Sequence, residues 1–165
     1  MAASRTITLK AIQCNLGRGQ TAFRELIAKC LSSNIDLALI QEPYIGNTGS
    51  VRSNSSFKLF QCHTNRDVRA AILVFNHLLK PILQTVHSNS DITTIDTTFD
   101  NKVHRFSSIY NPPNTDITSL LIKLSIARQT ADRMIIGGDI NSSHQIWTNM
   151  HRPDENGDSH KFLYI

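Results

Sequence analysis

A short apolar segment that follows an amphipathic helix does most to limit the fold of this 165-residue chain. Residues 35–40 (Ile-Asp-Leu-Ala-Leu-Ile) have the length of a buried strand, and Pro43 ends it. Residues 7–13 are typical of an earlier strand. Between them, apolar residues recur at helical spacing: Ala22, Phe23, Leu26, Ile27, Cys30 and Leu31. A strand, a helix and a buried strand in this order predict a crossover unit in a layered α/β fold.

The middle of the chain is rich in predicted strands. Residues 44–56 hold Gly, Asn and Ser, which indicates an exposed loop. Strand-like segments then follow at residues 57–63, 69–75, 81–87, 91–99 and 103–110. The break at residues 111–114 (Asn-Pro-Pro-Asn) separates these strands from the last part of the chain.

A second helix and another short strand follow the break. Thr115 or Asp116 can cap this helix, whose apolar residues are Ile117, Leu120, Leu121, Leu124 and Ala127 (with Arg128 as the alternative last member). Residues 134–136 indicate a buried strand, and residues 158–165 begin like a helix. We expect one domain, residues 1–165: a layered α/β sandwich of two mostly antiparallel or mixed β-sheets flanked by helices, incomplete at its C-terminus.

The composition indicates a globular chain in a reducing compartment. Hydrophobic residues make up 40% and charged residues 18% of the sequence. No apolar run approaches the roughly 20 residues that span a bilayer, and the N-terminus lacks the apolar core of a signal peptide. We therefore expect an intracellular protein with no membrane partner. The three cysteines, Cys14, Cys30 and Cys62, form no CxxC pair, which favours reduced thiols over metal or disulfide roles.

The formal net charge of +4 suits a polyanionic partner, but many proteins without such a partner share it. No cluster of Lys and Arg marks a contact surface, so charge alone does not predict nucleic-acid binding. The functional prediction has to come from motifs.

Polar groups stand where the predicted apolar strands end. They are Asn15, Glu42, Tyr110 and Asp139, with Asn141 two residues beyond. In a layered α/β fold such strand ends gather at one rim, where loops build a site. Each group alone is also typical of a solvated strand end or of a turn. Their order and spacing in the chain are more specific than any one of them.

These motifs together resemble the endonuclease/exonuclease/phosphatase superfamily, and within it the apurinic-endonuclease-like domains of non-LTR, Jockey-like retrotransposons. The resemblance rests on five segments, at residues 12–16 (Ile-Gln-Cys-Asn-Leu), 39–44 (Leu-Ile-Gln-Glu-Pro-Tyr), 69–72 (Arg-Ala-Ala-Ile), 108–113 (Ser-Ile-Tyr-Asn-Pro-Pro) and 138–144 (Gly-Asp-Ile-Asn-Ser-Ser-His). It covers nearly the whole chain. Trp147 after the last segment is a further shared feature.

The resemblance implies a Mg²⁺-dependent DNA endonuclease, with Mn²⁺ as a possible substitute. Glu42 is then the metal ligand, and Asn15 lies beside it to orient metal or phosphate. Asp139 orients or deprotonates the attacking water, while Asn141 and Tyr110 hold the scissile phosphate through neutral donors. The family role further implies a target DNA, a longer polyprotein with a reverse transcriptase, and a nuclear location.

Other residues have two interpretations each. His144 is either a substrate contact or a structural residue that bonds a backbone carbonyl. Trp147 is typical of packing more than of base stacking. Arg66 and Arg69 either face a phosphate or are solvated loop residues.

The chain departs from the family near its end. The family's general base is a histidine in a Ser-Asp-His motif, and the sequence ends at Ile165 before such a motif. Asp158-Ser159-His160 has the wrong order and leads into the predicted last helix. From this we expect a fragment of a nuclease domain. The alternatives are a truncated pseudoenzyme that binds only metal or nucleic acid, and a phosphoesterase of the same fold.

Overall fold

The computed structural model describes residues 8–113 and 115–141. In this part of the chain, four strands form the first sheet: β1 (Ala11–Asn15), β2 (Leu37–Gln41), β3 (Lys58–Gln61) and β4 (Ala70–Val74). Their order in the sheet is β1-β2-β4-β3. Strands β1 and β2 are parallel because helix α1 (Gln20–Ser32) carries the chain back between them, and the other pairs are antiparallel. The crossover unit predicted from the sequence is thereby confirmed.

The second sheet also has one parallel and two antiparallel strand pairs, but its parallel pair comes last in the chain. It contains β5 (Ile82–Leu83), β6 (Ile92–Phe99), β7 (Lys102–Tyr110) and β8 (Arg133–Asp139), in the order β5-β6-β7-β8. Helix α2 (Thr118–Arg128) connects β7 to the parallel strand β8, while the remaining pairs are antiparallel. Two short 3-10 helices are present: η1 (His77–Leu79) lies on the connection between the sheets, and η2 (Thr85–His87) lies between β5 and β6 of the second sheet.

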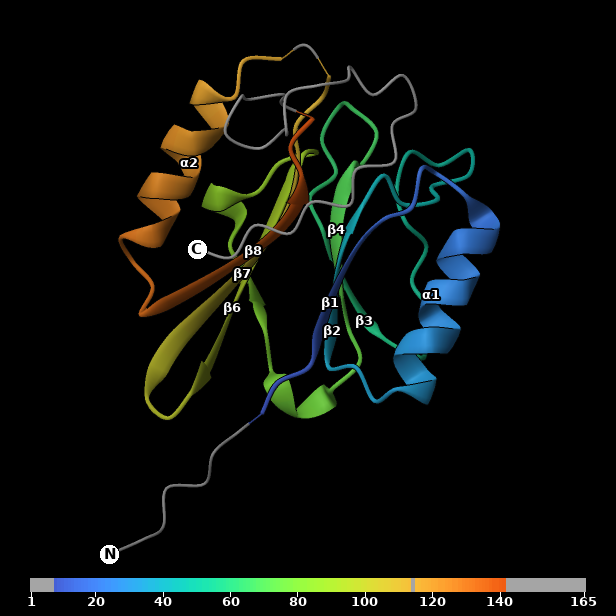
Figure 1. Ribbon diagram of the computed structural model, residues 1–165, viewed down its shortest axis with the longest axis horizontal. Coiled ribbons are helices and arrows are strands. Elements are labelled where there is room, and N and C mark those ends of the chain that lie inside the picture. The colour runs from blue at the N-terminus through green and yellow to red at the C-terminus, as the bar shows by residue number, and fades with distance from the viewer. Residues whose placement is uncertain (1–7, 114, 142–165) are drawn as a thin grey trace, which may run out of the picture.

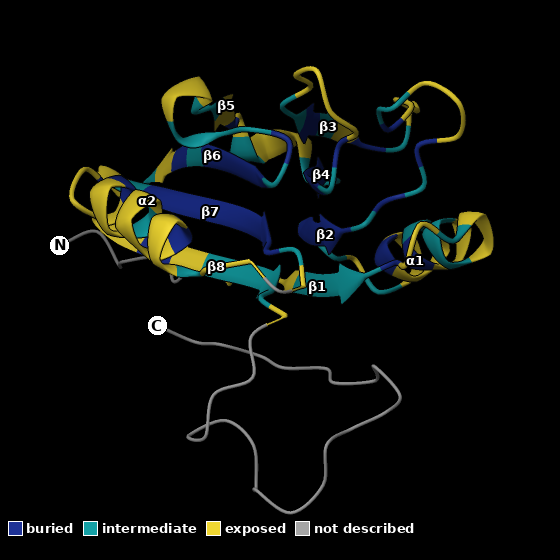
Figure 2. Ribbon diagram, turned by 90° about the horizontal axis from the view of Figure 1, so that it is seen from above, coloured by how far each residue is buried: buried dark blue, intermediate teal, exposed yellow. Residues whose placement is uncertain are grey.

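The two sheets pack face to face and each helix covers the outer face of one sheet (Figure 1, Figure 2). Figure 2 shows α2 and α1 on opposite sides, with the buried strands β7 and β2 between them. The edge strands β8 and β1 lie side by side in this view, and both are only half-buried. The predicted fold class, an α/β sandwich of two mixed sheets with flanking helices, is confirmed.

Alternation along β2 explains how one strand serves two layers. Ala38 and Ile40 face α1 and belong to the core between helix and sheet, whereas Leu37 and Leu39 belong to the core between the sheets. A third cluster, which includes Ile109 and residues of α2, lies on the outer face of the second sheet. Because the period of a strand is two, Gln41 shares the inner face with Leu37 and Leu39.

Several element predictions need correction. The first strand begins at Ala11 and ends at Asn15, later than the predicted 7–13, because Asn15 still pairs with Gln41 of β2. The predicted strand 81–87 is reduced to the two residues of β5, since η2 follows at once. Leu121 is 54% exposed although the helical pattern placed it on the buried face. The predicted helix at 158–165 lies outside the described residues.

Two other expectations can be compared with the structure. Cys14, Cys30 and Cys62 are free in the structure, and burial raises the pKa of Cys30 to about 11. In the described part of the chain, neither helix has the length and apolar character needed to cross a membrane.

Candidate active site

The candidate site lies at the rim where β1, β2, β7 and β8 end. Asn15 is the last residue of β1, Tyr110 the last of β7 and Asp139 the last of β8, while Glu42 follows β2. The side chain of Asn15 joins two carboxylates: its Nδ2 donates to Glu42 Oε2 at 3.2 Å and to Asp139 Oδ2 at 2.6 Å. The strand-end pattern in the sequence therefore marks side chains that the fold brings together.

The orientation of the Asn15 amide determines what it offers to a ligand. Its nitrogen faces the carboxylates, and its oxygen accepts a hydrogen bond from the backbone N–H of Gly17 at 2.9 Å. Asn15 thus acts as a donor toward the two acidic groups. The bond from Gly17 uses one of the two lone pairs of the amide oxygen.

Glu42 has an unusual backbone conformation, with φ of 43°. Its N–H donates to Arg69 O at 2.8 Å, and its C=O accepts from Arg18 N at 2.7 Å. A left-handed conformation costs energy in a residue with a side chain, so it persists where neighbours fix it. These two bonds hold Glu42 in the conformation that turns its carboxylate toward Asn15.

A second set of bonds connects the loop after β7 with the loop after β8. The backbone N–H of Asn111 donates to Asp139 O at 2.8 Å, and the Asn111 amide donates to Ile140 O at 3.1 Å. In return, Asn141 Nδ2 donates to Asn111 O at 3.0 Å. One N–H of the Asn141 amide is therefore used within the fold, and an amide has a second.

Tyr110 is 7% exposed and lies beside the acidic pair. Burial raises the pKa of its phenol, and the charge of Glu42, a hydrogen bond with Glu42 and the charge of Asp139 raise it further. The Arg69 guanidinium, which lies 5.3 Å from the centre of the Tyr110 ring, opposes this shift. Tyr110 therefore stays protonated near neutral pH and can donate a hydrogen bond.

Arg69 is more constrained than a solvated loop residue. Its Nε and Nη2 donate to the two oxygens of Asp91 at 2.5 and 2.8 Å, and it lies over the ring of Tyr110. This paired arrangement leaves Nη1 as the part of the guanidinium that does not bond Asp91. Whether Arg69 touches a substrate phosphate stays a prediction.

Sequence reasoning did not assign roles to Asn111 and Gln41. Asn111 is buried and bonds both loops of the site, although the sequence was interpreted only as a break between elements. Gln41 was treated as part of a motif, yet it lies fully buried between the sheets. Two signals were available: an Asn before Pro-Pro, and a polar residue at the inner-face position of a buried strand. His144, Trp147 and Asp158-Ser159-His160 lie outside the described residues.

The donor set at the rim fits a hard divalent cation. Glu42 and Asp139 present carboxylate oxygens within reach of one amide group, and Mg²⁺ keeps several waters, so that one or two carboxylates suffice. Residues 8–113 and 115–141 contain no group of three His, Cys, Asp or Glu side chains that would enclose a metal ion. An open site with two carboxylates is the arrangement present.

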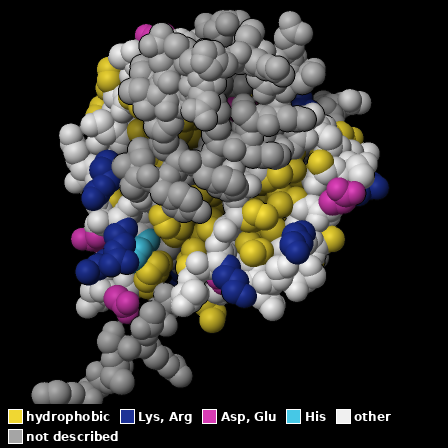
Figure 3. All heavy atoms as spheres, in the orientation of Figure 1, with side chains coloured by type: hydrophobic (Ala, Val, Ile, Leu, Met, Phe, Trp, Pro, Cys, Tyr) yellow, Lys and Arg dark blue, Asp and Glu magenta, His cyan; other side chains and the backbone are white. Residues whose placement is uncertain are grey.

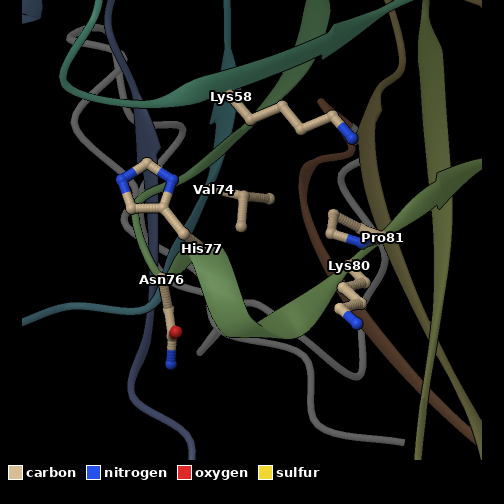
Figure 4. Close-up of a pocket in the computed structure, with 6 residues that line it drawn as sticks. All are labelled: Lys58, Val74, Asn76, His77, Lys80 and Pro81. Carbon is tan, nitrogen blue, oxygen red and sulfur yellow. The ribbon is translucent and has the colours of Figure 1, made fainter.

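A pocket of about 220 Å³ lies elsewhere in the fold (Figure 4). It is lined by Lys58, Val74, Asn76, His77, Lys80 and Pro81. Val74 pairs with Leu37 at the start of β2, so this pocket is at the opposite end of the sheet from Glu42. The Asn76 side chain is already bonded to Leu78 N and to Asp36, and both lysines are exposed. The pocket and the acidic site are therefore separate features.

The Lys and Arg side chains that are visible on the face drawn in Figure 3 do not form one patch. Lys and Arg side chains are scattered over this face, with hydrophobic groups between them. This agrees with the sequence, which contains no Lys and Arg cluster.

Fold and site together define the class of protein. Residues 104–163 match the family model described as endonuclease-reverse transcriptase. Two mixed sheets with acidic and amide side chains at one rim form the fold of the endonuclease/exonuclease/phosphatase superfamily, and the chain has this fold. A search of the curated proteins found no match.

Among solved structures, the chain is similar to the endonuclease domain of TRAS1, a telomere-specific non-LTR retrotransposon. The two share 28% sequence identity with a TM-score of 0.72, over 85% of this chain and 62% of that one. A D. rerio TDP2 complexed with a single-strand DNA product is similar in fold, at 15% identity and a TM-score of 0.53, over 82% of this chain and 62% of that one.

An endonuclease/exonuclease/phosphatase family protein from Leptotrichia buccalis C-1013-b also shares the fold. Its identity is 13% and the TM-score 0.52, over 82% of this chain and 67% of that one. The chain thus spans about three fifths of the length of the TRAS1 and TDP2 structures, 62% in each case. The resemblance to the non-LTR retrotransposon endonucleases, stated from the motifs, is confirmed by the TRAS1 comparison.

Proposed function

We propose that this chain is part of a Mg²⁺-dependent DNA endonuclease domain of a non-LTR retrotransposon, with Mn²⁺ as a substitute. The observation that carries the proposal is the bridge from Asn15 to both Glu42 and Asp139, three residues from separate strand ends. The likeness to the TRAS1 endonuclease domain supports DNA as the substrate. In this role the domain nicks target DNA and leaves a 3′-hydroxyl that primes reverse transcription, within a nuclear polyprotein that also holds a reverse transcriptase.

Each residue has a distinct part in this proposal. Glu42 holds the metal ion, and Asp139 orients or deprotonates the attacking water. The bound ion offsets the negative charge of the phosphodiester and of the leaving oxygen. Asn15 holds the two carboxylates in place through Nδ2, while its oxygen accepts from the Gly17 N–H. Asn15 is thus proposed as a positioning residue where the motif alone implied a ligand.

Two neutral donors complete the site. The protonated phenol of Tyr110 and the second N–H of Asn141 donate to phosphate oxygens, and they add no fixed charge. The sign of the Tyr110 shift matters here, because a pKa above the ordinary value keeps the proton available. His144 is proposed as a substrate contact from the family resemblance alone.

Nicking of supercoiled plasmid by the purified chain tests the proposal. Because the Ser-Asp-His motif that carries the family's general base is not among these 165 residues, we expect slow Mg²⁺-dependent nicking; EDTA abolishes it, and Glu42→Ala and Asp139→Ala each lower it by at least about 100-fold. Glu25→Ala is the matched control, because Glu25 is an exposed glutamate of α1. Nicking that persists in Glu42→Ala would show that the metal assignment is wrong.

Two further arms separate the alternatives. A chain that binds Mn²⁺ and DNA but leaves plasmid intact would be a binding module. Hydrolysis of a small phosphomonoester in place of plasmid would indicate a phosphoesterase of the same fold. The DNA endonuclease proposal requires plasmid nicking and no comparable turnover of the monoester.

A further inference from the structure

One group of hydrogen bonds lies just below the four strand ends of the site, and we call it the inter-sheet polar cluster. Its members are Gln13, Gln41, Ser108 and Gly137. Each precedes a site residue on its own strand by one or two positions. Gln13 precedes Asn15, Gln41 precedes Glu42, Ser108 precedes Tyr110 and Gly137 precedes Asp139.

Gln41 is the centre of this cluster. Its Oε1 accepts from Gln13 Nε2 at 2.5 Å, and its Nε2 donates to Ser108 Oγ at 2.8 Å and to Gly137 O at 3.2 Å. Both N–H groups of the amide are thus used. These bonds connect β1 and β2 of the first sheet with β7 and β8 of the second.

Ser108 extends the cluster back to the first sheet. Its hydroxyl accepts from Gln41 and donates to Ile40 O at 2.8 Å. Ser108 and Gln41 are both 0% exposed. The centre of the cluster is therefore shielded from solvent, while Gln13 and Gly137 at its margin are half-buried.

Apolar packing between the sheets does not explain why a polar residue occupies position 41. Leu37 and Leu39 occupy the inner face of β2, and Phe106 faces them from β7. A further apolar residue at position 41 would continue this layer, whereas a buried amide costs energy unless all its partners are in place. The sheets also approach closely here, since a Cβ on Gly137 would lie 2.7 Å from Leu39 Cδ1.

We propose that Gln41 is a positioning residue of the active site. Through the inter-sheet polar cluster it fixes the two sheets relative to one another at the level just below the rim. The separation of Glu42 from Asp139, which Asn15 bridges, depends on that arrangement. Gln41 is placed in the layer below the substrate and acts through its neighbours. The expected effect of Gln41 on metal affinity rests on the proposed function.

The variant Gln41→Met tests this, because Met has a similar length and no hydrogen-bonding amide. The first measurement is Mn²⁺ affinity by calorimetry on the 165-residue chain without DNA. We expect the Kd to rise about 10–100-fold, as for other groups that orient metal ligands from outside the coordination shell. The second measurement is the ¹H–¹⁵N signals of the Asn15 side-chain amide, assigned with Asn15→Ala. These signals should move toward the position of a solvated amide.

Thr93→Val is the matched control. Thr93 is also fully buried, and its Oγ1 donates across the same interface to Ala70 O at 2.8 Å, from β6 to β4. Its loss removes one inter-sheet hydrogen bond outside the polar cluster. We expect unchanged Mn²⁺ affinity and unchanged Asn15 signals, even where stability falls as much as in Gln41→Met.

The outcomes separate the two proposals. A folded Gln41→Met chain with wild-type Asn15 signals, or with changes no larger than those of Thr93→Val, overturns the positioning role. Should Gln41→Met not fold, Ser108→Ala, which removes one link of the cluster, takes its place with the same criteria. A wild-type chain that binds no Mn²⁺ contradicts the proposed function, and the Asn15 signals then decide the positioning role independently.

Discussion

Asn15 Nδ2 lies 2.6 Å from Asp139 Oδ2, and this bond joins two residues that are 124 positions apart in the chain. Asn15 ends an edge strand of one sheet, and Asp139 ends the edge strand of the other. The same nitrogen also reaches Glu42. A neutral donor thus holds together two carboxylates that would otherwise repel each other.

Replacement of Asn15 by Asp should convert this attraction into repulsion. Three carboxylates would then share the rim, so we expect the Asn15→Asp chain to lose roughly 2 kcal/mol of unfolding free energy at neutral pH without metal. In thermal unfolding, added Mn²⁺ should stabilise the Asn15→Asp chain more than it stabilises the wild type. Asn15→Ala is the control, since it lacks the extra charge. Equal Mn²⁺-dependent gains in the wild type and Asn15→Asp would contradict the arrangement.

Gly138 lies where the backbone of β8 meets β7. A Cβ at this position would be 2.1 Å from Ile109 Cγ1 and 2.7 Å from Ile109 O. A backbone oxygen cannot move aside cheaply, so Gly138→Ala should destabilise the chain by about 3 kcal/mol in chemical denaturation. For comparison, a Cβ at Gly17 meets nothing within 4 Å, and only its φ of +50° opposes alanine. Gly17→Ala should therefore cost less, about 1 kcal/mol; a larger loss than at Gly138 would count against the close packing of β7 and β8.

The buried ion pair between Arg105 and Asp96 should contribute far more to stability than the exposed pair between Arg18 and Asp67. Arg105 Nη2 lies 2.7 Å from Asp96 Oδ2, their side chains are 3% and 15% exposed, and Arg105 also donates to Ala127 O at the end of α2. Arg105→Met leaves a buried carboxylate without its partner, so we expect a loss of about 3–5 kcal/mol.

Arg18 provides the matched comparison. It pairs with Asp67 at 3.2 Å, and these side chains are 46% and 52% exposed. Arg18→Met should change the free energy of unfolding by less than about 1 kcal/mol. Equal losses of unfolding free energy in Arg105→Met and Arg18→Met, measured by urea titration, would mean that burial does not determine how much each ion pair stabilises the chain.

His104 should make the chain less stable in mild acid. It is buried, stacks on Phe99 with ring centres 3.5 Å apart, and its Nε2 has no hydrogen-bond partner among the described residues. Burial lowers its pKa from 6.5 and the charge of Arg133 lowers it further, while Asp132, Asp100 and a backbone bond at Phe99 oppose the shift. The folded state therefore binds this proton less readily than the unfolded state, and stability is lost as the pH falls below 6.5.

Thermal unfolding of the wild type and of His104→Phe, followed from neutral pH down to about pH 5, measures this effect. The variant should lose less stability over that range. The stability of the variant should still depend on pH to some extent, because burial and the charge of Arg105 lower the pKa of His87 as well. His77→Phe, at an exposed position, is the control and should follow the wild type. Identical pH profiles for His104→Phe and the wild type would rule out His104 as the cause.

Local patterns were sufficient to predict much of this protein. The stripe that includes Leu26 and Cys30 predicted α1, and the run at 35–40 predicted β2, because hydrophobic periodicity reflects which face of an element is buried. The five site residues could be proposed because they stand at or near the ends of apolar strands in the order and spacing of the family that the motifs resemble. The segment 81–87 was misjudged, since a short strand and a 3-10 turn there depend on pairing with β6.

Contacts between distant segments were decided by the tertiary structure alone. No local pattern in the chain states that Asn15 turns its nitrogen to Asp139, or that Gln41 bonds Ser108 and Gly137 in the opposite sheet. Sequence periodicity reports burial along one element, and these bonds depend on how two sheets are stacked and registered. The sequence by itself determined which side chains stand at the rim; the packing of the sheets determined their separation and the atoms that they present to one another.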